Sequence, residues 1–247
     1  MKKKFYRKLV IGDIHGAYKA LVQCLERANY DEDGDTLIIL GDVCDGWAHV
    51  KECIDLLITL PNVIYIIGNH DQWTLNWMNK GQKENLWLGQ GGTATIQSYC
   101  GYGECFGDWV DVPEEHKKFL RGAHLYLLDG EKLFLHGGIE LGTLVSENKP
   151  CDIIWDRELI KRAVQNQRIA NKQKLVPKNL TPYQEVFLGH TTTLIYGTTE
   201  PIHACEVWDL DTGAGYRGKV TIMDVDTKEY WQSDFVKDLY PNERGRK

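Results

Sequence analysis

The chain has 247 residues and a mass of 28.3 kDa, enough for one large domain with a substantial core, and no boundary divides it in two. Its hydrophobic content of 43% and charged content of 26% are ordinary for a globular protein and argue against disorder. The net charge of −6 gives no general attraction to nucleic acid or to an anionic membrane, so we expect no stable nucleic-acid binding.

The N-terminal residues and the cysteines bear on where the protein works. The first residues, Met-Lys-Lys-Lys, lead directly into a predicted strand, without the apolar segment of a signal peptide. No run approaches the roughly 18 apolar residues of a membrane span. The seven cysteines are an odd number without regular spacing, unlike a disulfide framework or a pair of zinc knuckles. We therefore expect small thiols in a reducing compartment, and a cytoplasmic protein that contacts no membrane.

The first hundred residues alternate between predicted strands and predicted helices. Apolar runs at 8–12, 36–40 and 63–67 are predicted strands, and each is followed by a segment with apolar residues at helical spacing. Continuous β-branched runs between helices indicate strands that are buried on both faces of a sheet. This order predicts a βαβα arrangement with parallel strands.

The remaining sequence is less regular and more antiparallel in character. Residues 113–121 predict a helix, and the runs 125–128 and 132–135 predict a hairpin. The polar stretch 156–182 is predicted as a solvated insertion, in which residues 156–173 are helical in composition. Four further strands are expected, at 185–188, 206–210, 220–225 and 229–232. A second sheet packed on the first would give one domain over 1–247, an α/β fold with a four-layer αββα sandwich of mixed sheets.

Polar side chains follow the predicted strands at their carboxyl ends, where ligands usually bind in an open α/β sheet. These strand-end residues are Asp13, His15, Asp42, Asn69, His70, His136 and His190. Oxygen and imidazole donors in this number can bind two divalent ions, and they suit Mn, Fe or Zn better than Ca or Mg. Two such ions can lower the pKa of a shared water and neutralise a phosphoryl group, so the set predicts a hydrolytic centre. The alternative is a group of turn and core residues that never meet.

Five motifs in this order resemble those of the calcineurin-like metallophosphoesterase superfamily. They are Gly12-Asp13-Ile14-His15-Gly16, Gly41-Asp42-Val43-Cys44-Asp45, Gly68-Asn69-His70-Asp71, His136-Gly137-Gly138 and Gly189-His190. Within the superfamily the chain is similar to the phosphoprotein phosphatases, in the style of bacterial and phage Ser/Thr phosphatases and diadenosine tetraphosphatases. The resemblance covers residues 8–232. It implies that Asp13, His15 and a bridging Asp42 bind the first metal, and that Asn69, His136 and His190 bind the second.

The same resemblance implies roles for residues beyond the metal ligands. His70 matches the general acid that protonates the leaving oxygen, and Asp45 matches the carboxylate that orients it; a neighbouring carboxylate favours a protonated imidazole. Arg157 matches a phosphate-binding arginine. Asn69 is counted among the substrate contacts as well as the metal ligands.

Two further residues are left without a role by the sequence. Asp211 is expected near the site. For His203, a structural role is favoured over a role as a metal ligand.

One position departs from the family pattern. The family usually reads Gly-Asp-x-x-Asp-Arg-Gly, whereas this chain has Gly46 where the first phosphate-binding arginine is expected. Loss of a bidentate guanidinium weakens phosphate binding unless another group replaces it. The adjacent Trp47 either contacts substrate by stacking on an aromatic group or nucleobase, or packs against the following helix. Both readings stay open at this point.

The resemblance implies a two-metal phosphoric monoester hydrolase with two divalent ions, Mn²⁺ being favoured over Fe or Zn. The preferred substrate is a phosphoprotein, which makes a serine/threonine protein phosphatase. The alternative is a nucleotide phosphoesterase such as a bis(5'-nucleosyl)-tetraphosphatase. A third, non-enzymatic alternative is a catalytically inactive binding module. The intact set of predicted ligands argues against it. The oligomeric state is not predicted.

Overall fold

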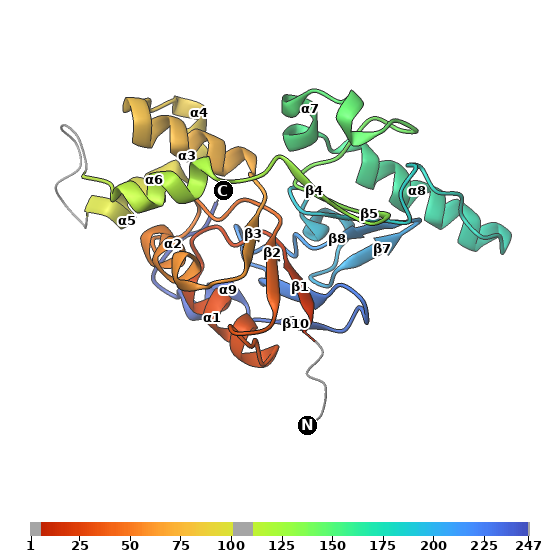
Figure 1. The fold of residues 1–247 in the computed structure, drawn as a ribbon, viewed down its shortest axis with the longest axis horizontal. Coiled ribbons are helices and arrows are strands. Elements are labelled where there is room, and N and C mark those ends of the chain that lie inside the picture. The colour runs from red at the N-terminus through yellow and green to blue at the C-terminus, as the bar shows by residue number, and fades with distance from the viewer. Residues whose placement is uncertain (1–5, 101–110, 247) are drawn as a thin grey trace.

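The structure is a computed structural model that describes residues 6–100 and 111–246. Two five-stranded mixed sheets pack face to face in this part of the chain, and helices cover their outer faces (Figure 1). The strand orders are β10-β9-β1-β2-β3 and β4-β5-β6-β8-β7. The predicted αββα sandwich is confirmed.

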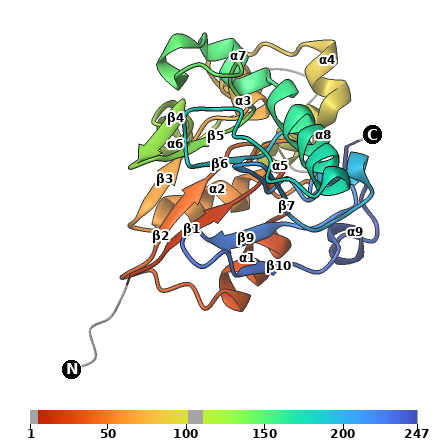
Figure 2. The same cartoon turned by 90° about the vertical axis from the view of Figure 1, so that its right-hand side faces the viewer.

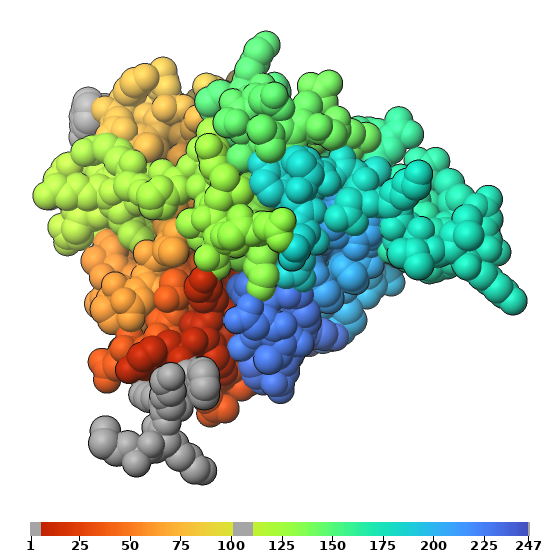
Figure 3. Space-filling view, turned by 45° about the vertical axis from the view of Figure 1, so that its right-hand side comes forward, coloured from red at the N-terminus to blue at the C-terminus, as the bar shows by residue number. Residues whose placement is uncertain are grey.

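The first sheet combines the parallel strands of the first hundred residues with two antiparallel strands from the other end of the chain. Its members are β1 (Lys8–Ile11), β2 (Thr36–Ile39), β3 (Val63–Tyr65), β9 (Thr221–Asp224) and β10 (Tyr230–Gln232). β1 pairs with β2 in parallel and with β9 in antiparallel orientation, so β9 and β10 extend the first sheet beyond β1 (Figure 2). Accordingly the red N-terminal and blue C-terminal segments lie side by side at the surface (Figure 3).

Helices cover the outer face of this sheet because each has one apolar side. They are α1 (Tyr18–Arg27), α2 (Val50–Thr59), α3 (Asn69–Lys80), α4 (Asn85–Trp87), the π-helical turn η1 (Leu88–Gly92), α5 (Thr93–Cys100), α6 (Glu114–Arg121) and α9 (Val236–Leu239). Leu21 of α1 and Leu57 of α2, for example, are buried in one cluster with Leu9 and Leu37 of the sheet. Burial of this apolar area is the main favourable contribution to packing here.

The second sheet is built from the middle of the chain. Its strands are β4 (Tyr126–Asp129), β5 (Lys132–Leu135), β6 (Glu185–Leu188), β7 (Ile202–Ala204) and β8 (Val207–Asp209), and the helical segments beside it are η2 (Val145–Glu147), α7 (Pro150–Trp155), α8 (Glu158–Gln173) and η3 (Thr193–Tyr196). The predicted hairpin is confirmed, since β4 and β5 pair in antiparallel orientation. β5, β6 and β8 are parallel neighbours.

Helix α8 differs from the solvated insertion that the sequence predicted for residues 156–182. Its polar residues face solvent, which accounts for the composition, but Leu159, Ile160 and Ala163 are fully buried. They pack in one cluster with Leu133 and Val186 of the second sheet. The helical part of that stretch is therefore the outer layer of the sandwich, and its few apolar residues are concentrated on one side.

An apolar layer joins the two sheets and sets their relative position. The rings of Phe134 on β5 and Phe187 on β6 stack with their centroids 4.8 Å apart. They are buried in one cluster with Val10, Ile38 and Met223 of the first sheet. This packing holds the carboxyl ends of β1, β2, β5 and β6 at the same edge of the molecule.

The cysteines only partly follow the expectation from sequence. Cys24, Cys44, Cys53, Cys151 and Cys205 are free thiols. The expectation of a free thiol is wrong for Cys100, which is disulfide-bonded. Cys105 lies outside the described residues, as do the residues before Tyr6. Among helices in the described ranges, none combines the length and the apolar character that crossing a bilayer requires.

The layer between the sheets predicts a large loss of stability when one of its rings is removed. Phe187→Ala is expected to lower the free energy of unfolding by about 3–5 kcal/mol, because it removes a fully buried ring and leaves a cavity. Leu175→Ala is the control, since that side chain is 62% exposed and its loss should change stability by less than about 0.5 kcal/mol. Urea denaturation measures both, and equal effects would contradict the packing described here.

Candidate metal centre

The structure brings the seven strand-end residues together at one edge of the sandwich. Asp13 and His15 follow β1, Asp42 follows β2, and Asn69 and His70 open α3 directly after β3. From the second sheet, His136 follows β5 and His190 follows β6. All seven side chains are at least 95% buried, so the set is an internal cluster and not a group of surface turns.

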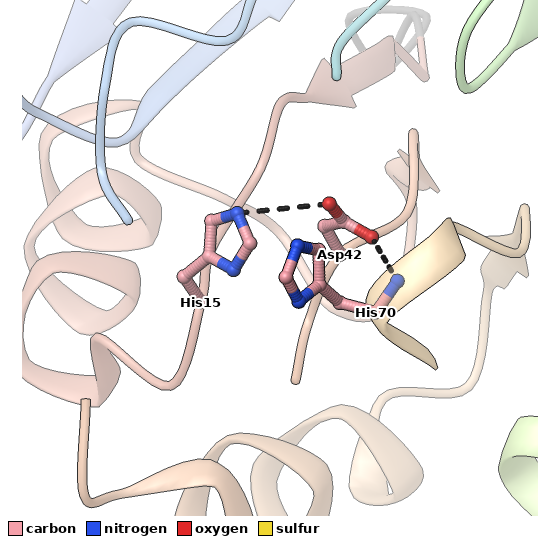
Figure 4. A group of neighbouring side chains, drawn as sticks. All are labelled: His15, Asp42 and His70. Carbon is pink, nitrogen blue, oxygen red and sulfur yellow. Dashed lines mark hydrogen bonds and ion pairs between the residues drawn. The ribbon is translucent and has the colours of Figure 1, made fainter. Parts of the chain in front are cut away.

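The carboxylate of Asp42 lies at the centre of the cluster. Its Oδ2 atom is 3.6 Å from Nε2 of His15 and 3.4 Å from Nε2 of His136. Asp42, His15 and His70 form one group whose potential ligand atoms all lie within 4.8 Å of one another (Figure 4). Asp42 forms a second such group with His136 and His190. One carboxylate therefore belongs to two adjacent sets of donors, which is the arrangement a bridging ligand needs.

Hydrogen bonds to the backbone fix which nitrogen of each imidazole faces the cluster. His15 donates from Nδ1 to the carbonyl of Cys44 at 3.0 Å, and His136 donates from Nδ1 to the carbonyl of Leu40 at 2.7 Å. Both Nε2 atoms thereby face Asp42, and such backbone bonds commonly orient histidines that bind metals.

Two buried polar atoms in the cluster, both of a kind that can bind a metal ion, have no hydrogen-bond partner. They are Oδ2 of Asp13 and Nε2 of His190. Leaving a buried polar atom unpaired costs free energy, which a bound cation would offset. The oxygen and imidazole set of this structure thus fits divalent metal ions.

The charges in the cluster suit a cation as well. The pKa of Asp42 lies well below its usual range: burial acts to raise it, but His136, His70 and His15 together outweigh burial. The pKa of His190 is lowered well below its usual value by burial and by the neighbouring His136, so its nitrogen keeps a free lone pair. Burial lowers the pKa of His136, but Asp42 and Asp13 raise it to about 9, so His136 would release a proton on binding a metal.

The backbone at four residues of the site adopts left-handed conformations that side chains other than glycine rarely take. The φ angles are 52° at His15, 50° at Asp42, 69° at Asp45 and 65° at His190. Such conformations cost on the order of 1–3 kcal/mol each and concentrate at functional sites.

Asp71 fixes the backbone of the loop that carries Asp42. The sequence did not single it out as a site residue. Its carboxylate accepts hydrogen bonds from the backbone N–H groups of Asp42 at 2.7 Å, Gly68 at 2.9 Å and Cys44 at 3.1 Å. Gly68 is required at this approach, because a Cβ atom there would lie 2.1 Å from Oδ1 of Asp42. The available signal was the position of Asp71 in the first turn of α3, where a carboxylate commonly caps a helix.

His70 and Asp45 form a buried pair beside the metal-ligand set. Nδ1 of His70 lies 2.6 Å from Oδ2 of Asp45, which directs Nε2 of His70 away from Asp45. Asp45 also accepts from Nε1 of Trp87 at 2.8 Å and from the hydroxyl of Thr95 at 2.6 Å. Trp87 and Thr95 come from the irregular helical region after α3, so sequence reasoning had no signal for their role.

The remaining predicted site residues lie in different surroundings. Arg157 is exposed next to the cluster, and its Nη1 donates to the carbonyl of His190 at 2.7 Å. Trp47 is only 1% exposed: its indole N–H donates to the carbonyl of Ala214 at 2.7 Å, and its ring stacks on Tyr240. The structure therefore favours the packing reading of Trp47 over the stacking contact with substrate.

The two residues that the sequence left without a role also have defined positions. Asp211 is buried close to the cluster, and burial together with the charge of Asp13 raises its pKa to about 7. His203 stacks on Trp208 at the edge of the second sheet.

The rings of two tryptophans contact each other next to the cluster. The ring of Trp73, on α3, lies edge-on to His70 at 5.1 Å and to Trp155 at 5.0 Å. Trp155, at the end of α7, is 5.9 Å from the ring of His190 and 41% exposed. The pair therefore connects the helical layers of the two sheets at the mouth of the site.

The three backbone hydrogen bonds of Asp71 predict that this residue controls metal affinity without contacting the metal. Asp71→Asn is expected to weaken Mn²⁺ binding roughly 10- to 100-fold, because an amide cannot accept all three bonds and the loop that carries Asp42 shifts. Isothermal titration calorimetry with Mn²⁺ measures the effect. Asp33→Asn, an exposed change, is the control. Equal Mn²⁺ affinity in the two variants would contradict the supporting role of Asp71.

Comparison with known proteins places this arrangement in a family. The family model described as Calcineurin-like phosphoesterase matches residues 6–198. The chain is 39% identical over 88 residues to serine/threonine-protein phosphatase 2 of Salmonella typhimurium, covering 35% of this chain and 39% of that protein. It is 26% identical over 132 residues to the symmetrical bis(5'-nucleosyl)-tetraphosphatase of Dechloromonas aromatica, covering 52% of this chain and 42% of that protein. The matches thus span about two fifths of these relatives.

Solved structures show the same fold. A protein provisionally named a diadenosine tetraphosphatase superposes with a TM-score of 0.66 and 17% identity, over 94% of this chain and 95% of that one. A metallophosphoesterase from Sphaerobacter thermophilus superposes with a TM-score of 0.53 and 19% identity, over 93% of this chain and 89% of that one. At these identities the likeness concerns the fold alone. Because the family model matches well over half of the sequence, the chain belongs to the calcineurin-like phosphoesterase family.

Proposed function

We propose that this protein is a two-metal hydrolase of phosphomonoesters, acting as a serine/threonine protein phosphatase with Mn²⁺ as its metal. The observation that carries the proposal is the buried Asp42 carboxylate, which lies between two pairs of histidines, His15 with His70 and His136 with His190. Membership of the family supports phosphoester hydrolysis. Two relatives of this chain, both from Salmonella typhimurium, are named serine/threonine-protein phosphatases.

Each half of the sandwich contributes ligands in this proposal. Asp13, His15 and Asp42 would hold one ion, and Asn69, His136 and His190 would hold the other, with Asp42 shared. Bound there, the ions supply a water of lowered pKa and neutralise charge on the phosphoryl oxygens. Mixed carboxylate, amide and imidazole donors support Mn²⁺, with Fe and Zn as alternatives.

His70 is the proton donor to the leaving oxygen in this proposal. Asp45 accepts a hydrogen bond from the Nδ1–H of His70, which leaves Nε2 as the ring nitrogen that faces the cluster. The burial of Asp45 and its bonds to Trp87 and Thr95 hold the carboxylate in place. This arrangement orients the imidazole without requiring Asp45 to contact substrate.

Arg157 and Asn69 are the proposed contacts of this site to the phosphoryl group. One Nη atom of Arg157 is bonded to the carbonyl of His190, and the side chain is otherwise exposed beside the cluster. A guanidinium in this position can present a fork of donors to two phosphoryl oxygens. Asn69 lies inside the cluster, with its Oδ1 atom 3.2 Å from Nε2 of His136.

A hollow next to the centre favours a protein substrate over a polyphosphate. It has a volume of about 730 Å³ and adjoins the site at Trp155. Its lining includes five acidic residues and one lysine: Glu140, Glu147, Asp152, Asp156, Glu158 and Lys149. A surface of this sign attracts basic residues that flank a phosphorylated serine or threonine, and it repels a chain of phosphates.

A nucleotide phosphoesterase is the second candidate. The observation that favours it is the tryptophan pair Trp73 and Trp155 at the mouth, because aromatic rings there can stack on a nucleobase. A relative named a bis(5'-nucleosyl)-tetraphosphatase supports the same reading. An inactive binding module has the least support, since no predicted metal ligand is missing from the cluster.

A substrate panel separates these candidates. Protein loaded with Mn²⁺ is expected to hydrolyse p-nitrophenyl phosphate. Its kcat/KM for phosphopeptides with basic flanking residues should exceed that for acidic flanks by about tenfold or more, because of the acidic hollow. Faster cleavage of diadenosine tetraphosphate than of any phosphopeptide would move the assignment to the nucleotide candidate. No hydrolysis of p-nitrophenyl phosphate or of bis-p-nitrophenyl phosphate would favour the binding module.

The role of His70 predicts a loss of turnover without a loss of metal. His70→Asn should lower kcat roughly 10²- to 10⁴-fold, since the leaving oxygen loses its proton donor, while the bound Mn²⁺ measured by atomic absorption stays at the wild-type level. His190→Asn is the matched comparison, because it removes a proposed ligand and should lower metal content. If His70→Asn also loses Mn²⁺, His70 acts as a ligand and not as the acid.

A further inference from the structure

The last segment of the described chain enters the candidate metal centre. Helix α9 leads to Tyr240, whose ring stacks on Trp47 with centroids 5.2 Å apart and whose hydroxyl accepts from the backbone N–H of Lys19 at 3.0 Å. At the end of this segment, the backbone N–H of Arg246 donates to the carbonyl of Gly215 at 2.7 Å. Contacts with three separate parts of the chain therefore fix the path of this segment.

The guanidinium of Arg246 lies next to a proposed metal ligand. Its Nη1 atom is 3.1 Å from Nε2 of His15, and its Nη2 atom donates to Oε1 of Gln90 at 3.0 Å. Its carbon Cζ lies 5.0 Å from the ring centre of Tyr216. The remaining donor, Nε, is buried without a hydrogen-bond partner. A buried guanidinium nitrogen with no partner among the protein atoms can donate to an oxygen of a bound anion.

The stem of Arg246 lies next to the position at which the sequence lacks the arginine of the family pattern. A Cβ atom at Gly46 would lie 3.6 Å from Cγ of Arg246 and 3.1 Å from Cβ of His15. The φ angle of +92° at Gly46 also disfavours any side chain there. The stem of Arg246 thus lies next to Gly46, where a Cβ atom would touch it at an ordinary contact distance and a longer side chain would have to pass it.

We propose that Arg246 binds a phosphoryl oxygen of the substrate and replaces the arginine that is absent at position 46. This inference rests on the proposed function and adds a substrate-binding residue to it. Arg246 lies beside His15 and Arg157 lies beside His190, so one guanidinium adjoins each of the two groups that share Asp42. A phosphoryl group at the centre would then meet a fork of donors from each side.

Metal binding and phosphate binding by Arg246 fit together chemically. Nη1 now uses the Nε2 lone pair of His15, the same lone pair that a metal ion would need. With that lone pair taken by an ion, Nη1 joins Nε as a donor without an acceptor, while Nη2 keeps its bond to Gln90. Nη2 carries a second N–H, so Nη1 and Nη2, which are adjacent on the planar group, can donate to two oxygens of a phosphoryl group.

Binding of inorganic phosphate to the Mn²⁺-loaded protein tests the inference apart from turnover. Arg246→Ala should weaken phosphate binding roughly 10- to 100-fold in isothermal titration calorimetry, because a charged, bidentate contact is lost. Arg246→Lys keeps the charge without the fork and should recover only part of the affinity. Arg244→Ala is the matched control, since this exposed arginine lies two positions away on the same segment. Thermal unfolding of each variant checks that the fold is retained.

The outcomes that would overturn the inference are distinct from failure of the proposed function. If wild-type protein binds phosphate and hydrolyses p-nitrophenyl phosphate, and Arg246→Ala binds phosphate as tightly as Arg244→Ala, the inference is wrong and the proposed function stands. If Arg246→Ala gains Mn²⁺ affinity without losing phosphate affinity, Arg246 only occupies the metal's place, and the inference is again wrong. A wild-type protein that neither binds phosphate nor hydrolyses phosphoesters contradicts both.

Discussion

The placement of one buried carboxylate, that of Asp42, is the constraint on which the rest of the site depends. Burying an ionised carboxylate is costly unless hydrogen bonds and opposite charges compensate for lost hydration. Here Oδ1 of Asp42 accepts from the backbone N–H of His70, and Oδ2 faces His15 and His136. Asp71 in turn holds the backbone of Asp42. A small shift of this loop would therefore disturb both sets of ligands at once.

The relative position of the two sheets allows Asp42 to lie near histidines from both of them. His15 comes from the first sheet and His136 from the second, so a single carboxylate can lie near both only when the two sheets keep a fixed offset. The stacked rings of Phe134 and Phe187 and the aliphatic side chains around them supply that fixed offset. Close-packed interiors transmit displacement instead of absorbing it, which links packing far from the cluster to the geometry of the ligands.

Much of the fold, and the clustering of the candidate ligands, could be predicted because the signals were local. Apolar runs that end in a glycine and a polar residue specify β1, β2 and β3 together with the side chains they deliver. Helix α8 was harder, since its buried residues are diluted by polar ones on the solvent side. Asp71 resembles an ordinary helix-capping residue in sequence, and only the fold shows what its carboxylate holds. Arg246 lies 231 residues from His15, a separation at which no periodicity or spacing carries information.

The altered sequence at Gly46 and Trp47 has a consequence for how this protein and its relatives diverge. A side chain longer than a single Cβ atom at position 46 would extend toward the stem of Arg246, while the ring of Trp47 stacks on Tyr240 of the segment that carries Arg246. Substitution at one of these places therefore changes what is tolerated at the others. The three positions should be inherited together: relatives that restore an arginine after Asp45 are expected to lose both the tryptophan and the distant arginine.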